Sequence, residues 1–188
     1  MAASLHPIPP RKKFSRALVD RMQEAGVFQE ERLELIDGEL IDKMGQNPPH
    51  SFLLRKLRVF LDTVFGEQRV LVQQPVEAAS GERERTLPEP DLAVLREDSP
   101  DYRTRHPRGD ELVLVVEVAD TTVHFDLTVK AGIYARAGVP EYWVADLNRN
   151  QIIVHRLPRE GEYRELRHLS GDDVVAPGSS ATAAELFD

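Results

Sequence analysis

The sequence predicts an α/β fold in which a mixed central β-sheet is flanked by helices. The run 112–118 is rich in β-branched residues and lacks apolar–polar alternation, which is typical of a central strand covered on both faces. A helical pattern over 126–137 follows, and then a second apolar strand at 142–146. A strand, a helix and a strand in this order predict a right-handed crossover between two parallel strands.

The amino-terminal half supplies two further helices and a hairpin. Apolar residues recur at helical spacing over 13–25, and Gly26 stands where a left-handed residue would end that helix. An Asp-Gly dipeptide at 37–38 favours a tight hairpin turn, so Glu39 is expected to open the second strand of a hairpin. The clearest helical pattern in the chain lies at 50–65.

Shorter strands should complete the sheet. They are expected at 69–74, 76–79 and 87–95, and two more at 151–157 and 163–169 are joined by a polar turn. Each segment has the β-branched or apolar composition of a strand and is bounded by turn-forming residues.

Length and composition predict one domain at 13–188, preceded by a proline-rich arm at 1–12. The chain has 188 residues, of which 41% are hydrophobic and 30% charged, and it contains no cysteine. Neither a membrane span nor a signal-peptide core is evident, so a cytoplasmic protein is expected.

The formal net charge of −8 does not favour nucleic-acid binding, because the phosphate backbone attracts basic surfaces. Basic residues nevertheless recur in three clusters, each of which is either a solvated surface or part of a binding face. The clusters are Arg11, Lys12, Lys13 and Arg16; Arg55, Lys56 and Arg58; and Arg103, Arg105 and Arg108.

Two acids stand where a metal site would need them. Asp91 follows a proline at the start of a predicted strand, and Glu117 interrupts the apolar run of the central strand. Mg²⁺ binds one or two protein carboxylates and completes its shell with water and substrate oxygens. Lys130, on the following helix, would add a cation that orients a nucleophile or offsets negative charge.

Each of these residues also has a purely structural interpretation. Glu39 after a turn could be a surface carboxylate, Asp126 and Lys130 could form a helical ion pair, and Asp91 could merely begin a strand. For Glu117 the functional interpretation is favoured, because a buried carboxylate is costly unless it is paired or bound to a metal.

The chain resembles the Uma-type restriction endonucleases of bacteria, within the PD-(D/E)xK nuclease superfamily, over about 33–157. The motifs that carry the resemblance are Leu-Glu-Leu-Ile-Asp-Gly-Glu-Leu at 33–40, Pro-Pro-His at 48–50, Pro-Asp-Leu at 90–92, Val-Glu-Val at 116–118, Asp126 with Lys130 and Tyr134, and Ala-Gly-Val-Pro-Glu-Tyr-Trp at 137–143.

This resemblance implies a restriction-endonuclease-like fold and an Mg²⁺-dependent endonuclease acting on DNA, with Mn²⁺ able to substitute. Asp91 and Glu117 would bind the metal, and Lys130 would complete the catalytic set. Replacing Lys130 by alanine is then expected to abolish cleavage and leave folding intact. The accessory positions are Glu39 as a third acid, His50, Asp126 and Tyr134.

Two departures leave an alternative open, the first from the superfamily and the second from the family. The superfamily's usual lysine lies two residues after the second acid, where this chain has Ala119, although the Uma-type pattern expects the lysine on the following helix, as at Lys130. The segment 119–122 is Ala-Asp-Thr-Thr instead of a Ser-Pro-Ser-like segment, and Asp120 adds another carboxylate. The alternative is a catalytically silent member that binds nucleic acid or a protein on the same scaffold. A metal hydrolase of another phosphoester is a third interpretation.

Cleavage of both strands of a duplex usually requires two sites, so a homodimer with two-fold symmetry is expected for the endonuclease.

Overall fold

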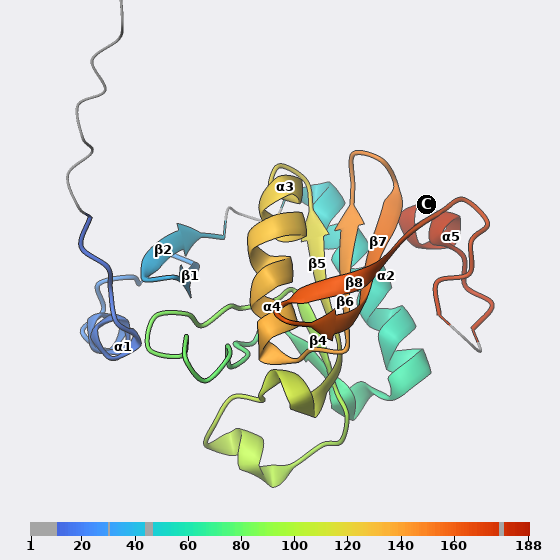
Figure 1. Ribbon diagram of the computed structural model, residues 1–188. Coiled ribbons are helices and arrows are strands. Elements are labelled where there is room, and N and C mark those ends of the chain that lie inside the picture. Colours follow the sequence, from blue (N-terminus) through green and yellow to red (C-terminus); the bar gives the residue numbers. More distant parts are fainter. Residues whose placement is uncertain (1–10, 30, 44–46, 177–178) are drawn as a thin grey trace, which may run out of the picture.

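The computed structural model describes residues 11–29, 31–43, 47–176 and 179–188. The predicted arm at 1–12 therefore lies almost wholly outside the described residues. Within them the strands form a six-stranded sheet and a separate two-stranded hairpin (Figure 1). The strands of the sheet, in spatial order, are β3 (Val70–Val72), β4 (Leu92–Leu95), β5 (Leu112–Ala119), β6 (Glu141–Asp146), β7 (Gln151–Arg159) and β8 (Glu162–Ser170).

The sheet is mixed, as predicted. Its neighbouring strands are antiparallel except for β5 and β6, which are parallel and place Glu117 opposite Val144. Leu92 pairs with Val116, so the residue before β4 lies next to the position of Glu117 on β5. The predicted parallel pair and the predicted neighbours of the central strand are confirmed.

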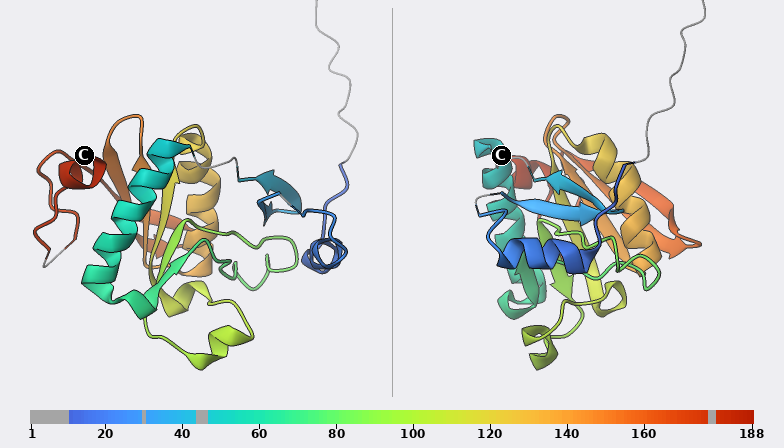
Figure 2. Two further views of the ribbon diagram at one scale, coloured as in Figure 1. Left: turned by 180° about the vertical axis from the view of Figure 1, so that it is seen from behind. Right: turned by 90° about the vertical axis from the view of Figure 1, so that its left-hand side faces the viewer.

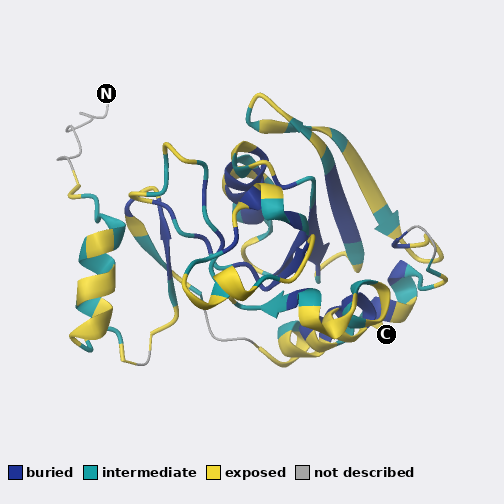
Figure 3. Ribbon diagram, turned by 90° about the horizontal axis from the view of Figure 1, so that it is seen from below, coloured by how far each residue is buried: buried dark blue, intermediate teal, exposed yellow. Residues whose placement is uncertain are grey.

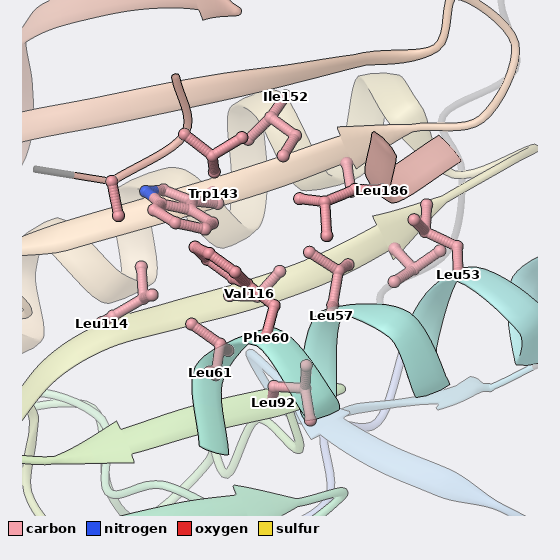
Figure 4. Close-up of a cluster of buried hydrophobic side chains, with 14 of the residues drawn as sticks. Leu53, Leu57, Phe60, Leu61, Leu92, Leu114, Val116, Trp143, Ile152 and Leu186 are labelled. Atoms are coloured by element: carbon pink, nitrogen blue, oxygen red, sulfur yellow. The ribbon is translucent and has the colours of Figure 1, made fainter. Parts of the chain in front are cut away.

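Helices cover both faces of the sheet (Figure 2). One face packs on α2 (Pro48–Phe65) and on α5 (Ala183–Phe187), a short helix that begins with a capping box of Thr182 and Glu185. The buried side chains of this layer are shown in Figure 4 and include Leu53, Leu57, Phe60, Leu61, Leu92, Leu114, Val116, Trp143, Ile152 and Leu186. The opposite face packs on α4 (Ala131–Ala137).

Strand β5 divides its side chains between these two layers, because successive residues of a strand point to opposite faces. Leu114, Val116 and Val118 belong to the core under α2, whereas Val115 and Ala119 belong to the core under α4. Glu117 therefore points toward the α4 side.

The segment between β5 and β6 is one continuous helical stretch made of three successive elements. It begins with α3 (Val123–Phe125), continues as the π-helix η4 (Asp126–Lys130) and ends as α4. Gly138 ends it in the left-handed conformation at φ 83°, as expected of a C-terminal glycine. A π-helical turn within a helix often marks a functional site.

The hairpin of β1 (Leu33–Ile36) and β2 (Glu39–Asp42) lies beside the main sheet, together with α1 (Arg16–Glu24). Its turn has positive φ at Asp37 (46°) and at Gly38 (73°), which confirms the predicted tight turn. Figure 3 shows that α1 carries exposed and half-buried residues, and none of them is fully buried. The backbone N–H of Phe14 donates to the carbonyl of Gly38 at 2.8 Å, so α1 is anchored to the hairpin.

The prediction of a strand at 76–79 was wrong. The chain makes only an isolated bridge there, between Glu77 and Arg108, because Pro75 cannot donate to a ladder and Gln73 has a positive φ of 51°. Short 3₁₀ helices lie at Glu67–Arg69, Pro100–Arg103 and Gly109–Glu111. Among the described helices, none combines the length and apolar composition that spanning a membrane requires.

Candidate active site

Asp91 and Glu117 meet where β4 begins beside β5. The Oδ2 atom of Asp91 accepts a hydrogen bond from the backbone N–H of Val118 at 2.9 Å. The backbone N–H of Asp91 donates to Oε2 of Glu117 at 3.4 Å. Both acids are almost completely buried and line one pocket between the sheet and the hairpin. The antiparallel pairing of the two strands fixes this approach.

Lys130 reaches the same pocket from the π-helical turn. Its Nζ lies 2.9 Å from Oε1 of Glu117, 2.9 Å from Oε1 of Glu34 and 3.7 Å from Oδ1 of Asp126. Only 4% of Lys130 is exposed. One buried ammonium is therefore shared by three carboxylates on three different elements, which is more than a helical ion pair.

Hydroxyl groups hold these charged side chains in place. The Tyr134 hydroxyl donates to Oε1 of Glu117 at 2.9 Å, and the Thr122 hydroxyl donates to Oδ2 of Asp126 at 2.6 Å. The Tyr142 hydroxyl donates to the carbonyl of Asp126 at 3.1 Å. Buried networks of this kind restrict each side chain to one geometry.

A second set of polar groups surrounds Asp91. Nε2 of His50 lies 3.2 Å from Oδ2 of Asp91, Nε2 of Gln73 donates to Oδ1 at 3.5 Å, and Nζ of Lys43 lies 4.0 Å from Oδ1. Burial by itself would raise the pKa of Asp91, but the His50 hydrogen bond and the Lys43 charge lower it to about 2. Asp91 is therefore held as a carboxylate.

The Glu117 carboxyl is in the opposite electrostatic state. Burial raises its pKa to about 8, and the charges of Asp91 and Asp126 act in the same direction against the opposing charge of Lys130. Burial likewise raises the pKa of Asp126, although Lys130 again opposes it. Burial would lower the pKa of Lys130, but its acidic neighbours raise it above its ordinary value. The pocket contains more acidic than basic side chains, so a further positive charge would stabilise it.

The structure does not bring Glu39 into the site, and Glu34 takes the place expected of it. Both residues share one face of the hairpin, because Glu34 pairs with Ile41 and Ile36 pairs with Glu39. Glu39 lies at the turn, where its side chain is 47% exposed and 3.5 Å from Nζ of Lys13. Strand alternation places Glu34 and Glu39 on the same face, but it does not specify which of the two reaches the sheet.

Replacing Glu34 by alanine is expected to lower the free energy of unfolding by about 1–3 kcal/mol, because a buried partner of Lys130 is lost. The matched change Glu39→Ala should alter it by less than about 0.5 kcal/mol, since that carboxylate is half exposed. Urea unfolding of the two variants measures the difference. Equal effects would show that Glu34 is not the buried acid described above.

Lys43, Gln73 and Glu34 were not identified from the sequence. Lys43 lies just after β2, and its Nζ also donates to the carbonyl of Glu89. Gln73 adopts a positive φ that is uncommon for a residue with a side chain, and its backbone N–H donates to the Asp91 carbonyl at 3.0 Å. No local pattern in the sequence distinguishes these residues from surface polar residues.

Comparison with known proteins identifies a family and a related fold. The model of the Uma2 family, described as "Putative restriction endonuclease", matches residues 19–185. The chain belongs to the Uma2 family. A solved structure of a putative nuclease of the DUF820 group from Anabaena variabilis aligns with a TM-score of 0.58 and 17% identity, over 84% of this chain and 90% of the other. At this identity the likeness shows the fold, and it confirms the predicted class. No curated protein matches the chain.

In this Uma2 member the lysine beside Glu117 comes from the π-helical turn rather than from β5. Ala119, at the usual lysine position, is fully buried among apolar side chains under α4. Asp120, the extra acid, lies at the rim of the pocket, where its Oδ2 accepts a hydrogen bond from Nδ2 of Asn47 at 2.7 Å.

The donor set of this Uma2 site fits Mg²⁺. Within the described residues, no three or more Asp, Glu or His side chains form a group that could hold a metal ion by themselves. Mg²⁺ requires fewer, since one or two carboxylates with water and substrate oxygens complete its shell. Asp91 and Glu117 supply two adjacent carboxyl groups in a pocket that is also lined by Glu34, Asp120 and Asp126.

Proposed function

We propose that this protein is a divalent-metal-dependent endonuclease that hydrolyses phosphodiester bonds of DNA. The observation that carries the proposal is the buried contact of Lys130 with Glu117, beside Asp91, at the end of two neighbouring strands. A buried, acid-rich pocket with a fixed lysine suits phosphoryl chemistry, in which positioning and charge stabilisation do most of the work.

In this proposal Asp91 and Glu117 hold Mg²⁺, which, when bound, polarises a phosphate oxygen and acidifies water. Lys130 offsets the negative charge that develops on the phosphate. Tyr134 keeps the Glu117 carboxylate oriented, and His50 does the same for Asp91. The chain's own groups therefore fix the geometry before the substrate arrives.

The acidic net charge does not prevent DNA binding at the site, because exposed charges more than about 10 Å apart are largely screened at 0.1 M salt. Bound metal, Lys130 and Lys43 would supply positive charge at the scissile phosphate itself. Phosphate contacts release counterions, so the reaction should depend strongly on salt.

The test is a cleavage assay with supercoiled plasmid and single-stranded DNA in Mg²⁺ or Mn²⁺. We expect nicking that falls steeply with added salt and that disappears with chelator and in Asp91→Ala. Mn²⁺ binding is measured separately by calorimetry. A protein that neither binds Mn²⁺ nor cuts either substrate would be the catalytically silent scaffold instead.

A further inference from the structure

A second pocket adjoins the candidate active site. Its walls come from α2, from the β6–β7 turn and from the carboxyl terminus, and they include Phe52, Leu147, Asn148, Asn150 and Phe187. Asp120 lines both pockets.

Hydrogen bonds fix the wall between the two pockets. The side chain of Asn47, which caps α2, donates to the Asp120 carboxylate at 2.7 Å. The side chain of Asn148 donates to the Asp120 carbonyl at 2.7 Å. The two pockets are therefore neighbours held at a fixed spacing.

The chemistry of the two pockets differs. The candidate active site is lined by carboxylates and lysines, whereas the second pocket is lined by apolar and amide side chains with Asp120 as its charged residue. A nucleotide has the same two parts, a charged phosphate and a flat base with polar edges. Amides can hydrogen-bond the edges of a base, and an aromatic ring can stack on its face.

Phe52 is suited to such stacking. It is the only exposed Phe, Tyr or Trp side chain in the described part of the chain, at 39% exposure. The guanidinium carbon of Arg55 lies 5.4 Å from its ring centroid, and Nζ of Lys56 lies 5.2 Å from it. An aromatic ring accompanied by cations is the usual surface on which proteins bind single-stranded nucleic acid.

We propose that this pocket takes one unpaired nucleobase of the nucleotide next to the scissile phosphate. The inference rests on the proposed function and refines its substrate to DNA with an unpaired base at the cut, such as a single strand or a frayed end. The base stacks on Phe52, its edge faces Asn148 and Asn150, and Arg55 and Lys56 contact the adjoining backbone.

The test is the binding of a thymidine oligonucleotide that carries a single 2-aminopurine, whose fluorescence falls on stacking. Ca²⁺ replaces Mg²⁺, and the oligonucleotide is checked to be intact. We expect quenching with the wild-type protein and a Kd roughly tenfold weaker in Phe52→Ala, with quenching lost. Phe52→Leu, which keeps apolar volume but has no flat face, should also lose the quenching.

The matched control is Val59→Ala. Val59 lies on the same face of α2 as Phe52, about 10 Å further along the helix, and is 61% exposed. It should bind like the wild type, and thermal unfolding checks that every variant is folded. With a fully paired duplex of the same sequence, adding the protein should cause no further quenching, and the result should not depend on Phe52.

The outcomes separate this inference from the proposed function. Cleavage of DNA with unchanged binding in Phe52→Ala, or quenching retained by Phe52→Leu, would overturn the base pocket alone. Quenching that depends on Phe52 without any cleavage would overturn the hydrolase alone. Absence of both binding and cleavage would overturn both, and the pocket would then be assigned to a protein partner.

Discussion

Replacing Lys130 by methionine is expected to lower the free energy of unfolding by about 3–5 kcal/mol at neutral pH. Methionine keeps the apolar length of the side chain but leaves the carboxylates of Glu34 and Asp126 without their cation and removes the charge that opposes the raised pKa of Glu117. The loss arises from buried charge rather than from packing. Cleavage should disappear as well. The burial of Lys130 therefore revises the sequence-based expectation that folding would survive its loss.

The measurement is urea unfolding at pH 7 and at pH 4. The cost should shrink at pH 4, because protonated carboxyl groups need no counterion. Lys12→Met removes an exposed lysine and provides the control. If Lys130→Met unfolded at the same urea concentration as the wild type, the shared-cation description would be wrong.

Replacing Glu117 by glutamine should move activity and stability in opposite directions. Cleavage is expected to fall by at least about 100-fold, as when a single charge-stabilising group is removed from other enzyme sites. Stability at pH 8 should be unchanged or higher, because glutamine can still accept hydrogen bonds from Lys130 and Tyr134 without a buried negative charge.

The pH dependence follows from the raised pKa of Glu117. The unfolded chain releases this proton near its ordinary value of 4.5, whereas the folded protein retains it up to about 8. The contribution to stability is therefore fully present below pH 4.5 and is lost as the pH rises through 8. Thermal unfolding of the wild type without divalent cation should show this loss between those values, and Glu117→Gln should show less of it.

Mn²⁺ provides the matching readout. It should raise the unfolding temperature of the wild type at pH 8, since binding favours the ionised carboxylates. Glu117→Gln should lose most of this shift. A variant that keeps both the shift and the cleavage would remove Glu117 from the metal-binding pair.

Much of the fold was predictable because its signals are local. The composition of β5 marks it as central, the Asp-Gly turn sets the hairpin, and Gly138 ends the helix. The convergence of Asp91 and Glu117 was predictable because the strands that carry them follow one another in the sequence, and consecutive strands are usually neighbours in a sheet.

The part of the site that was missed depends on long-range docking. Glu34 reaches the pocket because the hairpin folds back against the sheet, and nothing near it in the sequence specifies that contact. Glu39 fits the family pattern equally well, yet the hairpin register leaves it at the turn. Lys43 and Gln73 are polar residues, and the backbone around Asp91 fixes the orientation of their side chains.

The contact of Glu34 with Lys130 also has a consequence for how the protein is made. Glu34 leaves the ribosome about a hundred residues before its counterion does, which at 5–20 residues per second is a delay of roughly 5–20 s. During that interval the hairpin has no ammonium to accompany its carboxylate, so docking it would bury a bare charge. The hairpin can therefore dock with Glu34 in the pocket only on a nascent chain that already contains the helix after β5. On shorter chains it stays undocked.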